Sequence, residues 1–205
     1  MQPDTTSEDD RGCIIEAAYS CLSEPHSGPV PVAAILQRAG VSTRAFYRHF
    51  ESKDELFLAM LREESGALAG RLDRIADEGP TNPVDQLSAW INQMFGIVYD
   101  EQVRTHLMVI DSDEVRAAKG YRETRERSHA DRERSLVEIL RRGRADGSFP
   151  LADPEGDAVA ISAVVTREMS SQAADDERQL RQSQDRVLAF ALRALGAESA
   201  GSRVR

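Results

Sequence analysis

Residues 39–56 constrain the fold of this chain more than any other stretch, because they hold the signals of two short helices and a tight turn in close succession. Gly40 can adopt the positive φ that ends a helix. Ser42 is a good N-cap residue and predicts a helix that begins at Thr43. Two helices joined by a glycine-containing turn form a helix-turn-helix, whose second helix is placed to enter the major groove of DNA. The stretch therefore predicts a DNA-binding motif.

The second helix of this motif is predicted over residues 43–50. Phe46 and Phe50 lie four residues apart, so they share one buried stripe of that helix. Ser52 then caps a third helix, and Glu55, three residues further on, completes the spacing of a capping box. Lys53 would stand at the N-terminus of this third helix, a position that favours phosphate.

The charge of the chain is unevenly distributed. A formal net charge of -9 at first argues against a protein that binds nucleic acid. Between residues 29 and 53, however, four basic residues stand against one acidic residue, Glu51. Because salt screens distant charges, phosphate contacts act at short range, and a locally basic segment is compatible with DNA binding. The four basic residues are Arg38, Arg44, Arg48 and Lys53.

Several short motifs extend this pattern on both sides of the turn. They are Ile14-Ile15-Glu16-Ala17-Ala18, Ile35 with Ala39-Gly40-Val41-Ser42, Phe46-Tyr47-Arg48-His49-Phe50 and Ser52-Lys53-Asp54-Glu55-Leu56. With these motifs, the residues from Arg11 to about Glu63 resemble the DNA-binding domain of the TetR family of bacterial transcriptional regulators. The rest of the chain is similar to the family only in length and helical character.

Two departures from the family pattern lie just before the second helix. Pro31 stands where the family usually has Thr or Ser, and the loop of residues 24–28 is unusually rich in Pro and Gly. Both leave open whether that helix start has a side-chain cap and a phosphate contact.

The resemblance implies an all-α fold, in which an N-terminal three-helix helix-turn-helix domain precedes a larger helical ligand-binding and dimerisation domain. We expect a disordered acidic tail over residues 1–10, the DNA-binding domain over 11–55 and the effector-binding and dimerisation domain over 56–200. The abundance of Ala, Leu, Arg and Glu favours helix, and no strand pattern is present. Apolar periodicity predicts helices over residues 11–23, 32–39, 43–50, 53–76, 84–99, 103–110, 154–169 and 176–195. A further helix is predicted over residues 122–143, polar all round up to Ser135 and apolar on one face after it.

The residues that open the recognition helix are suited to reading bases. Arg44 could pair with a guanine through two hydrogen bonds, and Thr43 or Ala45 could touch a thymine methyl group. Tyr47 and His49 match positions at which the family usually contacts the DNA backbone. The alternative is a solvated, charged face on an ordinary helical hairpin, which the motifs disfavour. The predicted DNA-binding residues are Ser42, Thr43, Arg44, Ala45, Tyr47, Arg48, His49 and Lys53.

The body of the chain carries candidates for an effector pocket and a dimer interface. For each pocket candidate, plain core packing is the favoured alternative. The pocket candidates are Trp90, Met94, Phe95, Val98, Met108 and Ser128. The resemblance implies that the last two helices pair with those of a second subunit, and the residues assigned to that interface are Val165, Met169, Leu180, Val187, Ala191 and Leu195.

Other site types find little support. Cys13 and Cys21 fall eight residues apart in one predicted helix, about 12 Å at a rise of about 1.5 Å per residue, which is too far for a disulfide. We interpret them as small buried apolar residues, with a redox switch as the alternative. Asp111, Asp113 and Glu114 suggest a loop more than a metal site. Neither a cofactor nor an enzymatic motif such as a phosphate-binding loop is indicated.

No run of about 18 apolar residues is present, and the acidic start lacks the pattern of a signal peptide, so a cytoplasmic location is expected. The sequence thus predicts a homodimeric regulator that binds a palindromic operator on double-stranded DNA. Repression relieved by a small-molecule effector is the behaviour that the resemblance implies, and activation stays open. The alternative from another class is a helical carrier or enzyme in which the helix-turn-helix is only structural.

Overall fold

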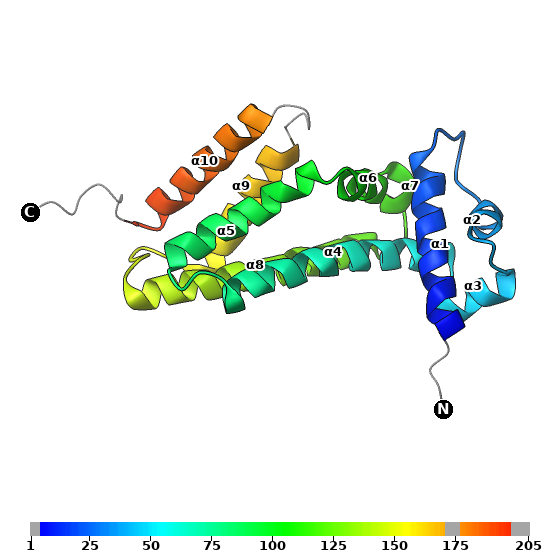
Figure 1. Cartoon of the computed structure of the whole chain (residues 1–205), viewed down its shortest axis with the longest axis horizontal. Coiled ribbons are helices and arrows are strands. Elements are labelled where there is room, and N and C mark those ends of the chain that lie inside the picture. The colour runs from blue at the N-terminus through cyan, green and yellow to red at the C-terminus, as the bar shows by residue number, and fades with distance from the viewer. Residues whose placement is uncertain (1–4, 171–176, 198–205) are drawn as a thin grey trace, which may run out of the picture. The chain divides into compact units, whose positions relative to one another are not determined.

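A computed structural model describes residues 5–170 and 177–197, and all regular structure within these ranges is helical (Figure 1). This confirms the predicted all-α fold. Two compact units divide the chain, one formed by Met1–Glu64 with Gln102–Glu126 and the other by Ser65–Glu101 with Arg127–Arg205. The helices are α1 (Thr5–Ser23), α2 (Val32–Ala39), α3 (Thr43–His49), α4 (Lys53–Glu78), α5 (Pro83–Gly96), the 3-10 helix η1 (Ile97–Tyr99), α6 (Glu101–Ile110), α7 (Asp113–Arg116), α8 (Tyr121–Asp146), α9 (Pro154–Ser170) and α10 (Glu177–Ala194).

The turn between α2 and α3 has the geometry that its sequence predicts. Gly40 adopts a φ of 67°, and its N–H donates to the carbonyl of Leu36. Ser42 Oγ accepts a hydrogen bond from the N–H of Ala45 at 3.1 Å, which caps α3. Ser52 Oγ caps α4 in the same way by accepting from the N–H of Glu55 at 3.1 Å. Local sequence signals therefore determine the start of both helices.

The first unit has one apolar core, to which α1, α2, α3 and the start of α4 all contribute. Phe46 and Phe50 are 1% and 2% exposed, as their spacing predicts. Residues of α6 and α7, which lie in the range expected for the second domain, complete this core. Its members include Ile14, Ile35, Phe46, Phe50, Leu56, Phe57, Met60, Leu61, Ile110 and Val115.

Helix α1 begins at Thr5, whereas the sequence led us to expect a disordered tail through residue 10. Two physical effects explain the difference. An acidic side chain such as Asp9 is favourable near the start of a helix, where the macrodipole is positive. Asp10 also forms an ion pair with Arg48 of α3 at 2.8 Å. The acidic segment is therefore part of the folded first unit from Thr5 onward.

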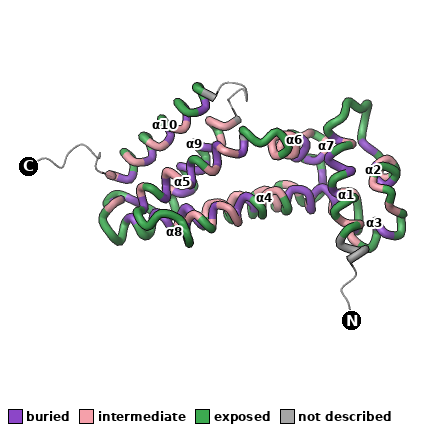
Figure 2. Tube along the Cα trace, viewed as in Figure 1, coloured by how far each residue is buried: buried purple, intermediate pink, exposed green. Residues whose placement is uncertain are grey.

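The second unit packs the remainder of α4 and α8 with α5, α9 and α10, and its helices have buried inner faces (Figure 2). Trp90 is fully buried, and its Nε1–H donates to Ser135 Oγ at 3.0 Å. This bond explains how α8, polar along most of its first half, still presents a buried face. On the outside of α8, Arg134 forms an ion pair with Asp73 of α4 at 2.6 Å.

One short helix, α7, was not predicted. Ser112 caps it by accepting from the N–H of Val115 at 3.4 Å, and Val115 is fully buried. The acidic residues around it lie on this cap and on the helix itself, not in a metal-binding loop; the described residues contain no group of three potential metal-ligating side chains. Within the same described ranges, no helix has the length and apolar character needed to cross a membrane.

Candidate nucleic-acid interface

Helix α3 divides cleanly into a buried and an exposed face. Thr43, Arg44, Tyr47 and Arg48 are exposed, with Tyr47 at 64%. They recur at the three- and four-residue spacing that places side chains on one side of a helix. An exposed tyrosine and two arginines on a short helix form a surface that can donate hydrogen bonds to base edges and phosphates.

Ala45 corrects one predicted base contact. It is only 6% exposed and lies with Phe46 against the core of the first unit, so its methyl group does not face outward. Ser42 is exposed, and its hydroxyl oxygen already accepts the N–H of Ala45. The hydroxyl hydrogen of Ser42 is not used in that bond and can donate to a phosphate.

His49 and Lys53 are less accessible than the sequence suggested. His49 is half-buried beside Phe50, and its buried Nε2 finds no hydrogen-bond partner within the described chain. Lys53 has a side chain that is 24% exposed, and its ammonium forms an ion pair with Glu114 of α7. The same ammonium lies 5.2 Å from the ring centroid of Phe57. Lys53 is thus held by the protein itself in the free chain.

Glu114 is a functional candidate that the sequence did not reveal. Besides Lys53, its carboxylate accepts the backbone N–H of Val30 at 3.0 and 3.2 Å and lies 3.6 Å from Nε2 of His26. Its side chain is only 16% exposed. Glu114 therefore connects α7, the segment before α2 and the N-terminus of α4. No local pattern could have predicted this, because Glu114 is 61 residues from Lys53 and 84 from Val30.

Helix α2 begins without a side-chain cap. Pro31 is the N-cap residue of α2, and it makes no side-chain cap hydrogen bond. Its carbonyl still accepts the N–H of Ala34 at 3.0 Å, so the helix begins normally. Because proline has no N–H and the preceding N–H of Val30 is bonded to Glu114, neither residue offers a backbone donor to phosphate.

Carboxylates hold three of the four basic residues between residues 29 and 53. Arg38 makes two hydrogen bonds to Glu24, at 2.6 and 2.8 Å, and the hydrogen bond from Arg38 lowers the pKa of the Glu24 carboxyl below its usual value. Arg48 pairs with Asp10 and Lys53 with Glu114. Among the described residues, Arg44 alone of these four has no carboxylate within ion-pair distance.

A second polar cluster joins α1, α4 and α6 inside the first unit. The rings of Tyr19 and His106 stack with centroids 3.7 Å apart, and Tyr19 Oη donates to the carbonyl of Met60 at 3.2 Å. His106 Nδ1 lies 3.0 Å from Glu64 Oε2. Burial, followed by the nearby charges of Glu64 and Glu63, raises the pKa of the Tyr19 hydroxyl above its ordinary value. The cluster fixes α6 against the two helices that support α3.

The residues predicted to line an effector pocket do not form one group. Trp90, Met94 and Phe95 are at most 1% exposed and belong to the core of the second unit. Ser128, in the same unit, is buried at 6%. Met108 is 71% exposed and belongs to the first unit, apart from the other pocket candidates of the second unit. The side chain of Val98 lies outside the described residues.

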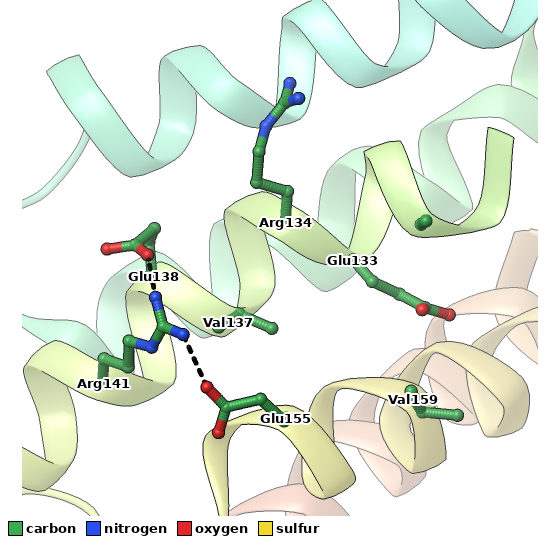
Figure 3. Close-up of a pocket in the computed structure, with 8 residues that line it drawn as sticks. Glu133, Arg134, Val137, Glu138, Arg141, Glu155 and Val159 are labelled. Carbon is green, nitrogen blue, oxygen red and sulfur yellow. Dashed lines mark hydrogen bonds and ion pairs between the residues drawn. The ribbon is translucent and has the colours of Figure 1, made fainter. Parts of the chain in front are cut away.

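A groove of about 320 Å³ lies between α8 and α9 of the second unit, and none of the predicted pocket residues lines it (Figure 3). Arg141 lies between Glu138 and Glu155, with hydrogen bonds of 2.7 and 2.6 Å. Because Arg141 is bonded to these two carboxylates and Arg134 is paired with Asp73, the groove presents no uncommitted arginine for an anionic ligand. The lining residues are Ala130, Glu133, Arg134, Val137, Glu138, Arg141, Glu155 and Val159.

The predicted dimer-interface residues are mostly turned inward. Five of them are at most 3% exposed in a single chain, namely Val165, Leu180, Val187, Ala191 and Leu195, and Met169 is half-buried. Apolar periodicity selects the stripe that packs inside one subunit, so these five residues cannot also face a second copy. Val159 on α9 and Phe190 on α10 are 55% and 43% exposed, and they are the large apolar side chains that the same helices offer outward.

A capped helix-turn-helix with an exposed, arginine-bearing second helix, followed by a separate helical unit, defines a DNA-binding transcriptional regulator. Residues 14–60, which include the whole motif, match the family described as bacterial regulatory proteins, tetR family. The N-terminal part of the chain is therefore similar to the DNA-binding domain of TetR-family transcriptional regulators.

Individual relatives support this assignment. The chain is 28% identical over 156 residues, 73% of each chain, to the HTH-type transcriptional repressor KstR2 of Mycolicibacterium smegmatis. Two solved structures have the same fold. One is SmeT of Stenotrophomonas maltophilia in complex with triclosan, with a TM-score of 0.76, 24% identity and coverage of 95% and 94% of the two chains. The other is FadR of Bacillus subtilis in complex with stearoyl-CoA, with a TM-score of 0.72, 19% identity and coverage of 89% and 98%.

Proposed function

We propose that this regulator is a repressor that binds a palindromic operator as a homodimer and leaves it when a small molecule binds the second unit. The observation that carries the proposal is the exposed face of α3, on which Arg44 alone of the basic residues from 29 to 53 has no carboxylate partner among the described residues. A guanidinium that no carboxylate engages can form two hydrogen bonds to O6 and N7 of a guanine. Thr43 beside it can contact a thymine methyl group.

Phosphate contacts fix the position of α3 in this proposal. Tyr47 is the most exposed large apolar or aromatic side chain of the helix and can donate its hydroxyl to a phosphate, as can Ser42 from the N-cap. The N-terminus of α4 adds a positive helix end. A dimer must place its two recognition helices one turn of DNA apart, about 34–36 Å, or a multiple of that distance. The operator should accordingly be an inverted repeat.

Ligand control requires that the effector bind one arrangement of the dimer better than the other. Relatives of the same fold are solved with triclosan and with stearoyl-CoA, both of which have a large apolar part. The second unit has an apolar interior around Trp90, Ile91 and Phe95. These observations support an effector that is predominantly apolar and enters this interior, where Ser135 of α8 supplies a polar group beside Trp90.

The test begins with selection of duplexes from a random pool by the purified protein. A palindromic sequence should be enriched, and its binding should weaken steeply as salt rises. Arg44→Ala should cost about 1–3 kcal/mol of discrimination between that sequence and random DNA. Arg144→Ala removes another exposed arginine, from the last turn of α8, and is the matched control.

Three results would contradict the proposal. They are a chain that stays monomeric at micromolar concentration, a selected pool without an inverted repeat, and equal discrimination by the Arg44→Ala and Arg144→Ala variants. A reporter gene under the selected operator distinguishes repression from activation, since deletion of the regulator gene should raise expression for a repressor.

A further inference from the structure

The basic side chains that would grip the DNA backbone are already neutralised within the free protein. Arg48, on the exposed face of α3, pairs with Asp10 of α1 at 2.8 Å. Lys53, at the start of α4, pairs with Glu114 of α7. Both carboxylates come from distant parts of the sequence, 38 and 61 residues away, so neither pair is a by-product of helix periodicity.

We propose that Asp10 and Glu114 act as internal counter-ions, which compete with DNA phosphates for Arg48 and Lys53 and so restrain binding to DNA of any sequence. The inference rests on the proposed function, because it concerns the same interface. Its consequence is that discrimination rests on Arg44, which has no such partner among the described residues, and not on general attraction to DNA.

In the Asp10–Arg48 pair, Arg48 can exchange the carboxylate of Asp10 for a DNA phosphate. The side chain of Arg48 is 55% exposed and that of Asp10 is 24% exposed. Ion pairs of this kind are weak in water, so a phosphate at the surface of α3 can displace the carboxylate. When it does, the negative charge of Asp10 stays beside the phosphate and offsets part of the attraction.

The Glu114–Lys53 pair differs because Glu114 has other bonds to retain. Its carboxylate also accepts the N–H of Val30 at 3.0 Å and is only 16% exposed. Glu114 therefore remains in place when Lys53 turns toward a phosphate. A fixed carboxylate at the N-terminus of α4 reduces the positive potential that this helix end would otherwise offer to DNA.

Counter-ion release gives the size of the effect. Each phosphate that a protein cation neutralises contributes about -0.9 to the slope of log K against log salt. A cation that keeps its own carboxylate contributes close to zero. Removing one carboxylate should therefore make the slope steeper by about 0.9, which corresponds to about fivefold tighter binding at about 0.15 M salt.

The experiment compares Asp10→Asn and Glu114→Gln with neighbouring variants that remove the same charge. Asp9→Asn and Asp113→Asn are the matched controls, because both residues are exposed and neither forms an ion pair in the described chain. Glutamine keeps an oxygen that can accept the N–H of Val30. Binding is measured by fluorescence anisotropy on a labelled duplex of random sequence and on the selected palindrome, from about 50 to about 200 mM salt.

We expect Asp10→Asn and Glu114→Gln each to tighten binding to both duplexes about fivefold at about 0.15 M salt, with controls below half of that gain. Adding Arg48→Ala to Asp10→Asn should abolish the gain from that variant. Unchanged slopes, or an equal gain in Asp9→Asn, would overturn the inference. A parent protein without salt-dependent binding to any duplex would instead refute the proposed function itself. If Glu114→Gln loses its helical circular dichroism, the comparison of Asp10→Asn with its control Asp9→Asn alone tests the inference.

Discussion

Replacing Gly143 by alanine should destabilise the protein, even though alanine favours helix. Gly143 lies in the last turns of α8, where a β-carbon would stand 2.0 Å from Cδ2 and 2.6 Å from Cε2 of Phe149. Phe149 is fully buried, and its N–H donates to the carbonyl of Gly143 at 2.8 Å. The ring therefore cannot retreat by a few tenths of an ångström, because the backbone that carries it is bonded to the same residue.

The magnitude follows from two opposing effects. Alanine gains about 1 kcal/mol over glycine within a helix. Expelling a buried phenylalanine ring costs about 3–5 kcal/mol. The free energy of unfolding should fall by about 2–4 kcal/mol, which lowers Tm by roughly 4–16 °C for a chain of this size. Gly66, on the exposed side of α4, has open space where a β-carbon would stand, with no neighbouring atom within 4 Å, so Gly66→Ala should raise stability by about 0.5–1 kcal/mol.

Urea unfolding followed by far-ultraviolet circular dichroism measures both variants. The protein concentration must be the same for parent and variants, because association shifts the apparent stability. The same substitution should lower the free energy of unfolding at Gly143 and raise it at Gly66. A Gly143→Ala variant as stable as the parent would contradict this expectation, as would a Gly66→Ala variant destabilised by a comparable amount.

Three further predictions concern single hydrogen bonds. Ser135→Ala leaves the buried Nε1–H of Trp90 without its acceptor, so we expect a loss of about 1–3 kcal/mol in urea unfolding and a changed emission of this single tryptophan. Ser42→Ala removes the cap of α3 and should cost about 1 kcal/mol in the same assay, while Ser42→Gly should cost less. Because burial raises the pKa of Tyr19, the folded state favours the neutral hydroxyl; stability should be intact below the ordinary pKa of 10.0 and fall as pH rises above it, and this fall should be smaller in Tyr19→Phe.

Local features of the fold could be predicted because each depends on a few neighbouring residues. The bounds of α2 and the starts of α3 and α4 follow from Gly40, Ser42 and Ser52, whose conformation and hydroxyl groups determine where a helix ends or begins. The start of α1 was wrong because acidic composition alone suggested disorder. A tertiary ion pair to Arg48 and a favourable helix end outweigh that composition.

Site residues were harder to predict, since the spacing of residues along a helix does not distinguish a side chain that packs inside the subunit from one that faces a partner. Ala45 opens α3 next to exposed residues, yet the helix turns it inward with Phe46. In α9 and α10, an apolar repeat identifies the face that packs within one subunit, whereas Val159 and Phe190 lie on the exposed side of the same helices. The partners of Lys53 and Arg48 depend on how distant segments meet, which no spacing in the sequence encodes.

The unusual start of α2 and the unpredicted helix α7 are connected through Glu114. Pro31 cannot donate a backbone N–H, and Glu114 accepts the N–H of Val30 just before it. The backbone N–H just before this helix start is thus bonded to α7 and is not offered to phosphate. Since Glu114 also holds Lys53, a displacement of α7 would release a donor at α2 and a cation at α4 together. Glu114→Ala should therefore change both DNA affinity and the stability of the first unit, whereas Lys53→Ala should leave the Val30 contact intact and affect mainly affinity.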